Sequence, residues 1–198
     1  MKKIKIDDLI AKKNREKIVM ITAYDALFAR LFDEFADMIL IGDSLNMSFG
    51  GSSETLGISV DEMIYHTKAV ERGAKRAFLV VDMPFGSAIT PKIALKNAVK
   101  IYKNTCCDAV KIEGGKEMAK TINLLNQNGI AVIAHIGLKP QLSRQEGGYK
   151  VAGRDEEAAQ SIIEDALALE KAGAKMVLIE GVPSELGKRV TQALKVPT

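Results

Sequence analysis

The sequence Ala109-Val110-Lys111-Ile112-Glu113 is a short aliphatic run that ends in a carboxylate and is followed by two glycines. Runs of this length and composition, bounded by glycine, are typical of strands buried in a parallel sheet. Four further runs of the same kind each end in a side chain that titrates or can bind a metal. They are Met38-Ile39-Leu40-Ile41-Gly42-Asp43, Phe78-Leu79-Val80-Val81-Asp82, Ala131-Val132-Ile133-Ala134-His135 and Met176-Val177-Leu178-Ile179-Glu180.

Strand-like runs alternate with polar loops and amphipathic stretches along the chain, which predicts six βα units, the first strand being 18–23. Helices are expected over 6–13, 26–35, 60–72, 91–103, 117–128, 156–172 and 184–194, and plain loops over 46–57 and 139–154. Strict alternation indicates either a doubly wound sheet or a (β/α)₈ barrel. A doubly wound sheet concentrates its site at one switch point. The ionisable endings are spread over five runs, which favours the barrel.

The length of the chain bears on how much of a barrel it can hold. A (β/α)₈ barrel normally needs about 250 residues, and this chain has 198. We therefore expect a single α/β barrel domain over 1–198 that lacks the last two βα units at its C-terminal end.

Composition and charge exclude several classes of protein. The net charge is only +3 and is mixed along the sequence, which does not indicate a nucleic-acid partner. No apolar stretch has the length of a signal peptide core or a membrane span. The two cysteines, Cys106 and Cys107, are adjacent and are expected to be reduced thiols. These features predict a cytoplasmic protein with no membrane partner.

Three carboxylates, Asp43, Asp82 and Glu113, end neighbouring strands of the predicted barrel. The carboxyl ends of barrel strands converge on one face, where active sites are built. Carboxylate oxygens are hard ligands that suit Mg²⁺. The alternative is that each carboxylate caps the helix that follows its strand.

Lys111 and Glu113 are two residues apart in a strand and therefore point to the same side, into the barrel. A buried lysine needs an anionic partner. That partner is either Glu113 alone, in a structural ion pair, or a bound carboxylate as well.

His135 and Glu180 end the fifth and sixth strands. A lone histidine at such a position is either a core residue with satisfied hydrogen bonds or part of the site. Glu180 is well placed to act as a general base, with helix capping as its alternative role.

Several segments together resemble the ketopantoate hydroxymethyltransferase family, in the expected order and spacing from about residue 18 to residue 197. They are Ile21-Thr22-Ala23-Tyr24-Asp25, Gly42-Asp43-Ser44-Leu45, Tyr65-His66-Thr67, Asp82-Met83-Pro84-Phe85, Val110-Lys111-Ile112-Glu113-Gly114-Gly115, His135-Ile136-Gly137-Leu138 and Gly147-Gly148-Tyr149-Lys150-Val151.

The resemblance implies a (β/α)₈ barrel of the phosphoenolpyruvate/pyruvate type. It also implies transfer of a hydroxymethyl group from 5,10-methylenetetrahydrofolate to 3-methyl-2-oxobutanoate, through a Mg²⁺-stabilised enolate, to give 2-dehydropantoate for pantothenate and coenzyme A synthesis. It further implies a ring-like homo-oligomer, decameric in the family. The alternatives are a Mg²⁺-dependent 2-oxo acid lyase or mutase of the same barrel superfamily, and a non-enzymatic assembly subunit.

The resemblance also implies roles for single residues. Asp43, Asp82 and Glu113 are the expected metal-site carboxylates, and Glu180 is the expected catalytic base. The side chains expected against the 2-oxo acid are Asp43, Ser44, Asp82, Lys111 and His135.

Overall fold

A curved parallel sheet of six strands forms the centre of the molecule in the computed structural model, which describes residues 2–198. The strands are β1 (Met20–Thr22), β2 (Met38–Ile41), β3 (Phe78–Asp82), β4 (Ala109–Glu113), β5 (Val132–Gly137) and β6 (Met176–Glu180). All neighbouring strands pair in parallel, and their spatial order follows the chain from β1 to β6. This order contains no reversal and hence no switch point, so the doubly wound alternative is wrong.

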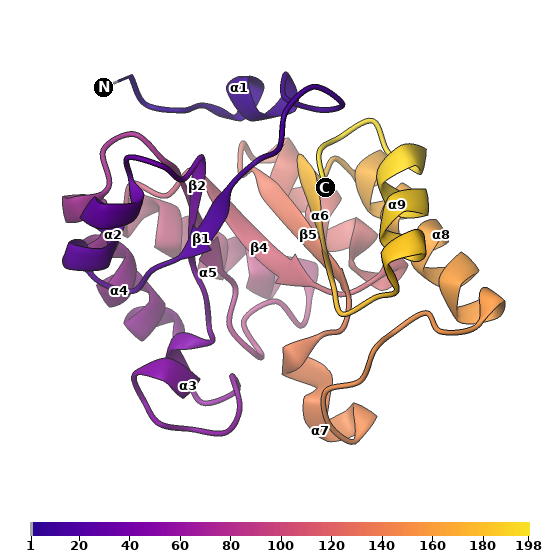
Figure 1. Cartoon of the computed structure of the whole chain (residues 1–198). Coiled ribbons are helices and arrows are strands. Elements are labelled where there is room, and N and C mark those ends of the chain that lie inside the picture. Colours follow the sequence, from indigo (N-terminus) through magenta and orange to yellow (C-terminus); the bar gives the residue numbers. More distant parts are fainter. Residues whose placement is uncertain (1) are drawn as a thin grey trace.

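The helices lie mainly on the outer, convex side of this sheet (Figure 1). They are α1 (Ile6–Ile10), α2 (Ala26–Phe32), α3 (Leu45–Ser48), α4 (Val60–Gly73), α5 (Pro91–Asn104), α6 (Ala119–Gln127), α7 (Ser143–Glu146), α8 (Glu156–Ala172) and α9 (Ser184–Ala193), with 3₁₀ turns η1 (Lys116–Met118) and η2 (Pro140–Leu142). Strands inside and helices outside give a half-barrel with β1 and β6 at its two edges. Within residues 2–198 no helix is both long and apolar enough to span a bilayer.

The helix boundaries follow local capping chemistry. Ser59 and Glu62 form a reciprocal capping box at the start of α4, and the Asp155 side chain accepts the Ala158 N–H at the start of α8. Gly173, in the left-handed region at φ 105°, ends α8. These signals explain why the predicted range 156–172 matches α8.

The predicted loops differ from the structure. The segment 46–57 begins within the short helix α3, and 139–154 contains η2 and α7. Both segments lie at the end of the half-barrel opposite α1 (Figure 1). Four-residue helices have too few positions to show a helical period in the sequence, which explains why they were expected to be plain loops.

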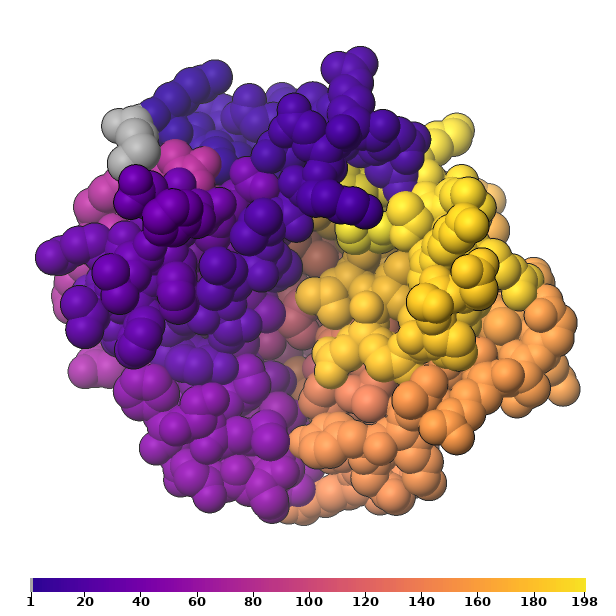
Figure 2. Space-filling view, viewed as in Figure 1, coloured from indigo at the N-terminus to yellow at the C-terminus, as the bar shows by residue number. Residues whose placement is uncertain are grey.

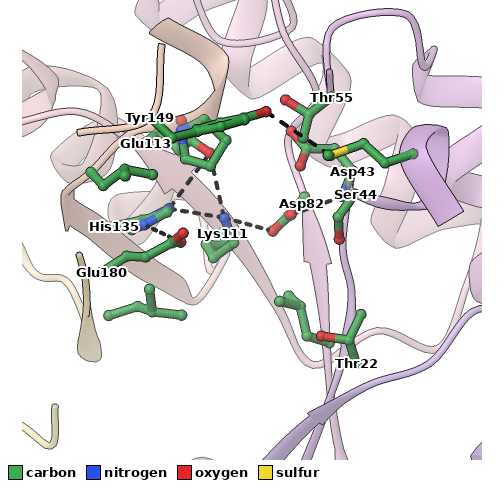
Figure 3. A pocket seen from close by; sticks show the side chains of 15 residues that line it. Thr22, Asp43, Ser44, Thr55, Asp82, Lys111, Glu113, His135, Tyr149 and Glu180 are labelled. Carbon is green, nitrogen blue, oxygen red and sulfur yellow. Dashed lines mark hydrogen bonds and ion pairs between the residues drawn. The ribbon is translucent and has the colours of Figure 1, made fainter. Parts of the chain in front are cut away.

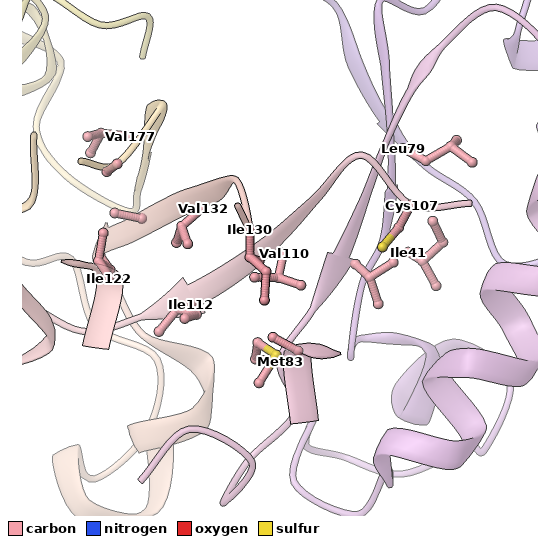
Figure 4. Packing of buried hydrophobic residues seen from close by; sticks show 14 of the residues in the cluster. Ile41, Leu79, Met83, Cys107, Val110, Ile112, Ile122, Ile130, Val132 and Val177 are labelled. Atoms are coloured by element: carbon pink, nitrogen blue, oxygen red, sulfur yellow. The ribbon is translucent and has the colours of Figure 1, made fainter. Parts of the chain in front are cut away.

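Two apolar clusters hold the layers together, and strand alternation decides which residue joins which. Val110 and Ile112 of β4 point outward into the cluster between sheet and helices (Figure 4). Ala109 points inward, into a smaller cluster with Leu9 of α1. The inner cluster fills the α1 end of the half-barrel, so Lys111 and Glu113, on the same side as Ala109, face the barrel interior as predicted.

Candidate active site

A pocket of about 390 Å³ opens at the carboxyl ends of the strands. Every residue predicted for the site lines it: Asp43, Ser44, Asp82, Lys111, Glu113, His135 and Glu180 (Figure 3). The space-filling view shows the molecule hollowed between its N-terminal and C-terminal parts (Figure 2). The sheet thus brings together side chains that are up to about 140 residues apart in the sequence.

The register of the strands sets which side chains meet. Asp82 on β3 is directly opposite Lys111 on β4, and Glu113 is opposite His135 on β5. The Lys111 Nζ atom lies 3.1 Å from Asp82 Oδ1 and 3.9 Å from Glu113 Oε1. The expectation of Glu113 as the only partner within the protein is therefore wrong, because the β3–β4 register brings Asp82 closer.

Lys111 is a buried cation inside a group of carboxylates, with only 5% of the residue exposed. Burial alone would lower the pKa of Lys111, but Asp82, Glu113 and Asp43 outweigh burial and raise it above the ordinary value. The ammonium group is therefore the fixed positive charge of the pocket floor.

Asp43 and Asp82 are close neighbours, since the Asp43 backbone N–H donates to Asp82 Oδ2 at 2.9 Å. Burial, and then repulsion by Asp82, raises the pKa of Asp43 to about 7. Burial likewise raises the pKa of Asp82, although Lys111 and the Asp43 N–H oppose the shift. Ser44, the next residue, shares a 2.9 Å hydrogen bond with the Tyr24 hydroxyl, which orients it beside the same pocket.

The buried carboxylates have unused capacity for a cation. Asp82 Oδ1 and Glu113 Oε1 face Lys111 but have no aligned hydrogen-bond partner among the described residues. Residues 2–198 contain no group of three or more His, Cys, Asp or Glu side chains already spaced as a metal cage. Mg²⁺ usually takes one or two protein carboxylates, with water and substrate oxygens completing its shell. Asp43 and Asp82 together supply the two carboxylates that such a Mg²⁺ site needs.

His135 connects the buried cluster to the rim of the pocket. Its Nδ1 lies 3.2 Å from Lys111 Nζ and 3.5 Å from Glu113 Oε1, and its Nε2 lies 3.2 Å from Glu180 Oε2. Burial and Lys111 lower the pKa of His135, but Glu113 and Glu180 outweigh them and raise it. The Glu180 side chain is 46% exposed, whereas that of His135 is 2% exposed. Glu180 thus lies at the pocket mouth within ion-pair distance of a buried imidazole, whose Nε2 makes no aligned hydrogen bond among the described residues.

Glycine at position 137 allows β5 and β6 to approach closely beside the site. Its φ is 88°, and a Cβ there would come within 2.2 Å of the Glu180 carbonyl oxygen. Any larger residue would displace the strand end that carries Glu180.

The helix-capping alternatives are wrong for these carboxylates. Side-chain caps come instead from Asp25, Ser59, Thr90 and Asp155, at α2, α4, α5 and α8. The helices α3, α6 and α9, after β2, β4 and β6, have no side-chain cap, and their N-cap residues are Ser44, Met118 and Pro183. The site carboxylates are therefore free to face the pocket.

Gln141 is a site residue that the sequence did not reveal. It lies in η2, after β5, and its side chain donates to Asp43 Oδ2 at 2.7 Å. Its one signal in the sequence is its position in the polar loop that follows a site strand.

The family model for ketopantoate hydroxymethyltransferase matches residues 3–198. A curated relative from Campylobacter fetus subsp. fetus, named 3-methyl-2-oxobutanoate hydroxymethyltransferase, is 72% identical over 198 residues, which are 100% of this chain and 75% of that protein. A relative of the same name from Helicobacter hepaticus is 58% identical over 197 residues, again 100% of this chain and 75% of the relative.

Solved structures at lower identity share the fold. The crystal structure of 2,3-dimethylmalate lyase, a PEP mutase/isocitrate lyase superfamily member, is similar with a TM-score of 0.67 and 18% identity, covering 98% of this chain and 68% of that one. The complex of phosphonopyruvate hydrolase with oxalate and Mg²⁺ has a TM-score of 0.67 and 15% identity, with coverage of 91% and 64%. With this fold and the sequence matches, the chain belongs to the ketopantoate hydroxymethyltransferase family.

Proposed function

We propose that this chain transfers a hydroxymethyl group from 5,10-methylenetetrahydrofolate to 3-methyl-2-oxobutanoate, giving 2-dehydropantoate for pantothenate and coenzyme A synthesis. The names of the curated relatives support the acceptor and the transferred group. The observation that carries the proposal is the arrangement of the pocket, in which a buried ammonium lies among carboxylates and a more exposed carboxylate stands at the mouth.

The pocket suits a small branched 2-oxo acid. Lys111 supplies a fixed positive charge for the substrate's negative oxygens, and Ser44 supplies a hydroxyl. Leu40 and Leu178 add apolar wall that fits an isopropyl group. The volume of about 390 Å³ lies in the range of small-molecule sites.

Asp43 and Asp82 would hold Mg²⁺, with Glu113 as the third carboxylate of the metal site. Two buried oxygens, Asp82 Oδ1 and Glu113 Oε1, make no aligned hydrogen bond among the described residues, which supports this assignment. The hard-ligand chemistry of carboxylates supports it as well, as does the Mg²⁺ in the fold relative phosphonopyruvate hydrolase. When bound, Mg²⁺ would act as a Lewis acid toward the keto oxygen and stabilise the negative charge that develops there.

Glu180 would act as the general base by accepting the C3 proton of the 2-oxo acid. The electron pair left on C3 forms the new bond to the methylene carbon of the folate as one of the two carbon–nitrogen bonds of that carbon breaks. Water then supplies the hydroxyl oxygen as the second carbon–nitrogen bond breaks, and the protons from C3 and from water end on the two nitrogens of tetrahydrofolate. His135, whose Nε2 lies 3.2 Å from Glu180 Oε2, would hold the base in place between turnovers.

The half-barrel supports a complete (β/α)₈ barrel of the phosphoenolpyruvate/pyruvate type as the family's architecture. Its strand order leaves β1 and β6 as edges that further βα units would join. We also propose a homo-oligomer, because Leu27, Phe28 and Leu31 of α2 expose apolar side chains that further protein would cover.

The lyase or mutase alternative rests on fold similarity at 15–18% identity, which does not specify a reaction.

Isotope exchange directly tests the proposed removal of the C3 proton by Glu180. Glu180→Gln should still bind 3-methyl-2-oxobutanoate in calorimetry with Mg²⁺ present, yet lose exchange of the C3 proton in deuterated water. Glu157→Gln makes the same chemical change on the exposed start of α8 and should exchange like the wild type. Exchange at the wild-type rate in Glu180→Gln would assign the base to another residue.

A further inference from the structure

One residue, Gln141, connects the ends of three strands beside the pocket. Its side-chain Nε2 donates to Asp43 Oδ2 at 2.7 Å, after β2, and to the Met83 carbonyl at 3.0 Å, after β3. Its backbone N–H donates to Glu113 Oε2 at 3.0 Å, at the end of β4. Gln141 itself follows β5, so four neighbouring strand ends meet at this one residue.

These contacts define the orientation of the Gln141 amide. Its nitrogen faces a carboxylate oxygen and a carbonyl oxygen, both of which accept hydrogen bonds. A flipped amide would place its oxygen against two other oxygens, so the nitrogen is the only chemically reasonable group there. One oxygen of Asp43 is thereby turned toward Gln141, and the other oxygen stays available to the pocket.

We propose that Gln141 is a positioning residue for the cation site, holding the Asp43 carboxylate in the orientation that binds a divalent metal. This inference rests on the proposed function, because it takes Asp43 as a metal ligand. Hydrogen-bond partners of ligating groups restrict their rotation, and their loss typically weakens metal binding by about 10–100-fold. Gln141 performs this task from the 3₁₀ turn η2, whereas the proposed ligands lie at strand ends.

A second contact joins the same loop to the opposite side of the pocket mouth without touching Asp43. Arg144 of α7 donates through Nε to Glu54 Oε2 at 2.8 Å and pairs with the same carboxylate through Nη2. The Arg144 side chain is 73% exposed, so this contact is a surface ion pair. Loop attachment and Asp43 orientation can therefore be separated by mutation.

Calorimetric titration with Mg²⁺ alone tests the proposal. Gln141→Met keeps the volume of the side chain and removes its amide, and it should weaken Mg²⁺ binding about 10–100-fold. Arg144→Met, and Gln160→Met on the exposed face of α8, should bind Mg²⁺ like the wild type. Gln141→Asn, whose shorter amide does not reach Asp43, should show the same loss and replaces the methionine variant if that variant does not fold.

Limited trypsin digestion provides a readout that is independent of the metal. Gln141→Met and Arg144→Met should both speed cleavage after Lys150, an exposed residue of the same loop, and only Gln141→Met should change the Mg²⁺ affinity. Mg²⁺ affinity within twofold of wild type in Gln141→Met would overturn the positioning role, as would an equal loss in Arg144→Met. Failure of the wild type to bind Mg²⁺, or unchanged binding in Asp82→Asn, would instead overturn the cation site, and the role of Gln141 with it.

Discussion

Replacing Lys111 by methionine should destabilise the protein strongly, although the two side chains have similar volumes. Lys111 Nζ lies 3.1 Å from Asp82 Oδ1 and 3.9 Å from Glu113 Oε1, in a residue that is 5% exposed. Methionine carries no charge, so the variant would bury these carboxylates without their cation. Removing one partner of a buried ion pair leaves an uncompensated charge in a region that water cannot reach.

The expected size of the effect follows from the distances. With an effective dielectric constant of about 20, the attraction is about 5 kcal/mol to Asp82 and about 4 kcal/mol to Glu113. Desolvation of the ammonium, which costs several kcal/mol, offsets a large part of that attraction in the wild type. Broken buried pairs lose about 3–5 kcal/mol, and we expect the free energy of unfolding to fall by that amount.

Urea unfolding followed by circular dichroism, with a chelator present, measures the loss. Lys120→Met, on the exposed face of α6, is the matched control and should stay close to the wild type. Combining Lys111→Met with Asp82→Asn removes one of the unpaired charges and should recover part of the stability. A Lys111→Met variant as stable as the control, or a double variant no better than the single one, would refute the view that Lys111 neutralises the buried carboxylates.

Three further predictions concern regions away from the pocket. Burial alone would raise the pKa of Asp33, but the backbone N–H groups of 75–77 outweigh it and hold the pKa below the ordinary 3.8. Asp33→Asn should therefore lower the free energy of unfolding by about 1–3 kcal/mol at pH 7, as measured in urea. The difference in unfolding free energy from the wild type should narrow as the pH falls from 3.8 through the lowered pKa of Asp33 in the folded state. An equal difference at pH 7 and pH 2 would contradict this. Leu9→Ala leaves a cavity at a fully buried position of the inner cluster and should lower the free energy of unfolding by about 2–5 kcal/mol. An unchanged free energy of unfolding in the same assay would show that α1 does not close its end of the half-barrel. Cys106 is exposed and should react with a thiol reagent in the folded protein, whereas burial raises the pKa of Cys107 to about 12 and should delay its reaction until unfolding; equal rates for both thiols would count against this packing.

Much of the site could be predicted because strand position decides it. In a parallel sheet the carboxyl ends share one edge, so an ionisable residue at the end of an aliphatic run has a known location. Alternation then placed Lys111 and Glu113 inside and Val110 outside, as observed. These inferences need only the local sequence and the geometry of a strand.

The pairings across strands and loops could not be predicted in the same way. Asp82 is the nearest partner of Lys111 because of the β3–β4 register, which depends on how two distant segments pack. The contact from Gln141 to Asp43 spans 98 residues and depends on the path of a loop that has no hydrophobic period. A single sequence carries little information on either of these long-range choices.

The sequential strand order has a consequence for synthesis on the ribosome. Each strand from β2 onward pairs with the strand that precedes it in the chain, so a newly emerged βα unit finds its neighbour already made. We expect the sheet to grow in the direction of translation, at the pace of about 5–20 residues per second at which the chain appears. Asp43 and Asp82 would be in place well before β6 delivers Glu180. A nascent chain would thus acquire its acidic pocket before its proposed base, and the proposed proton transfer could not begin before the sixth strand had docked.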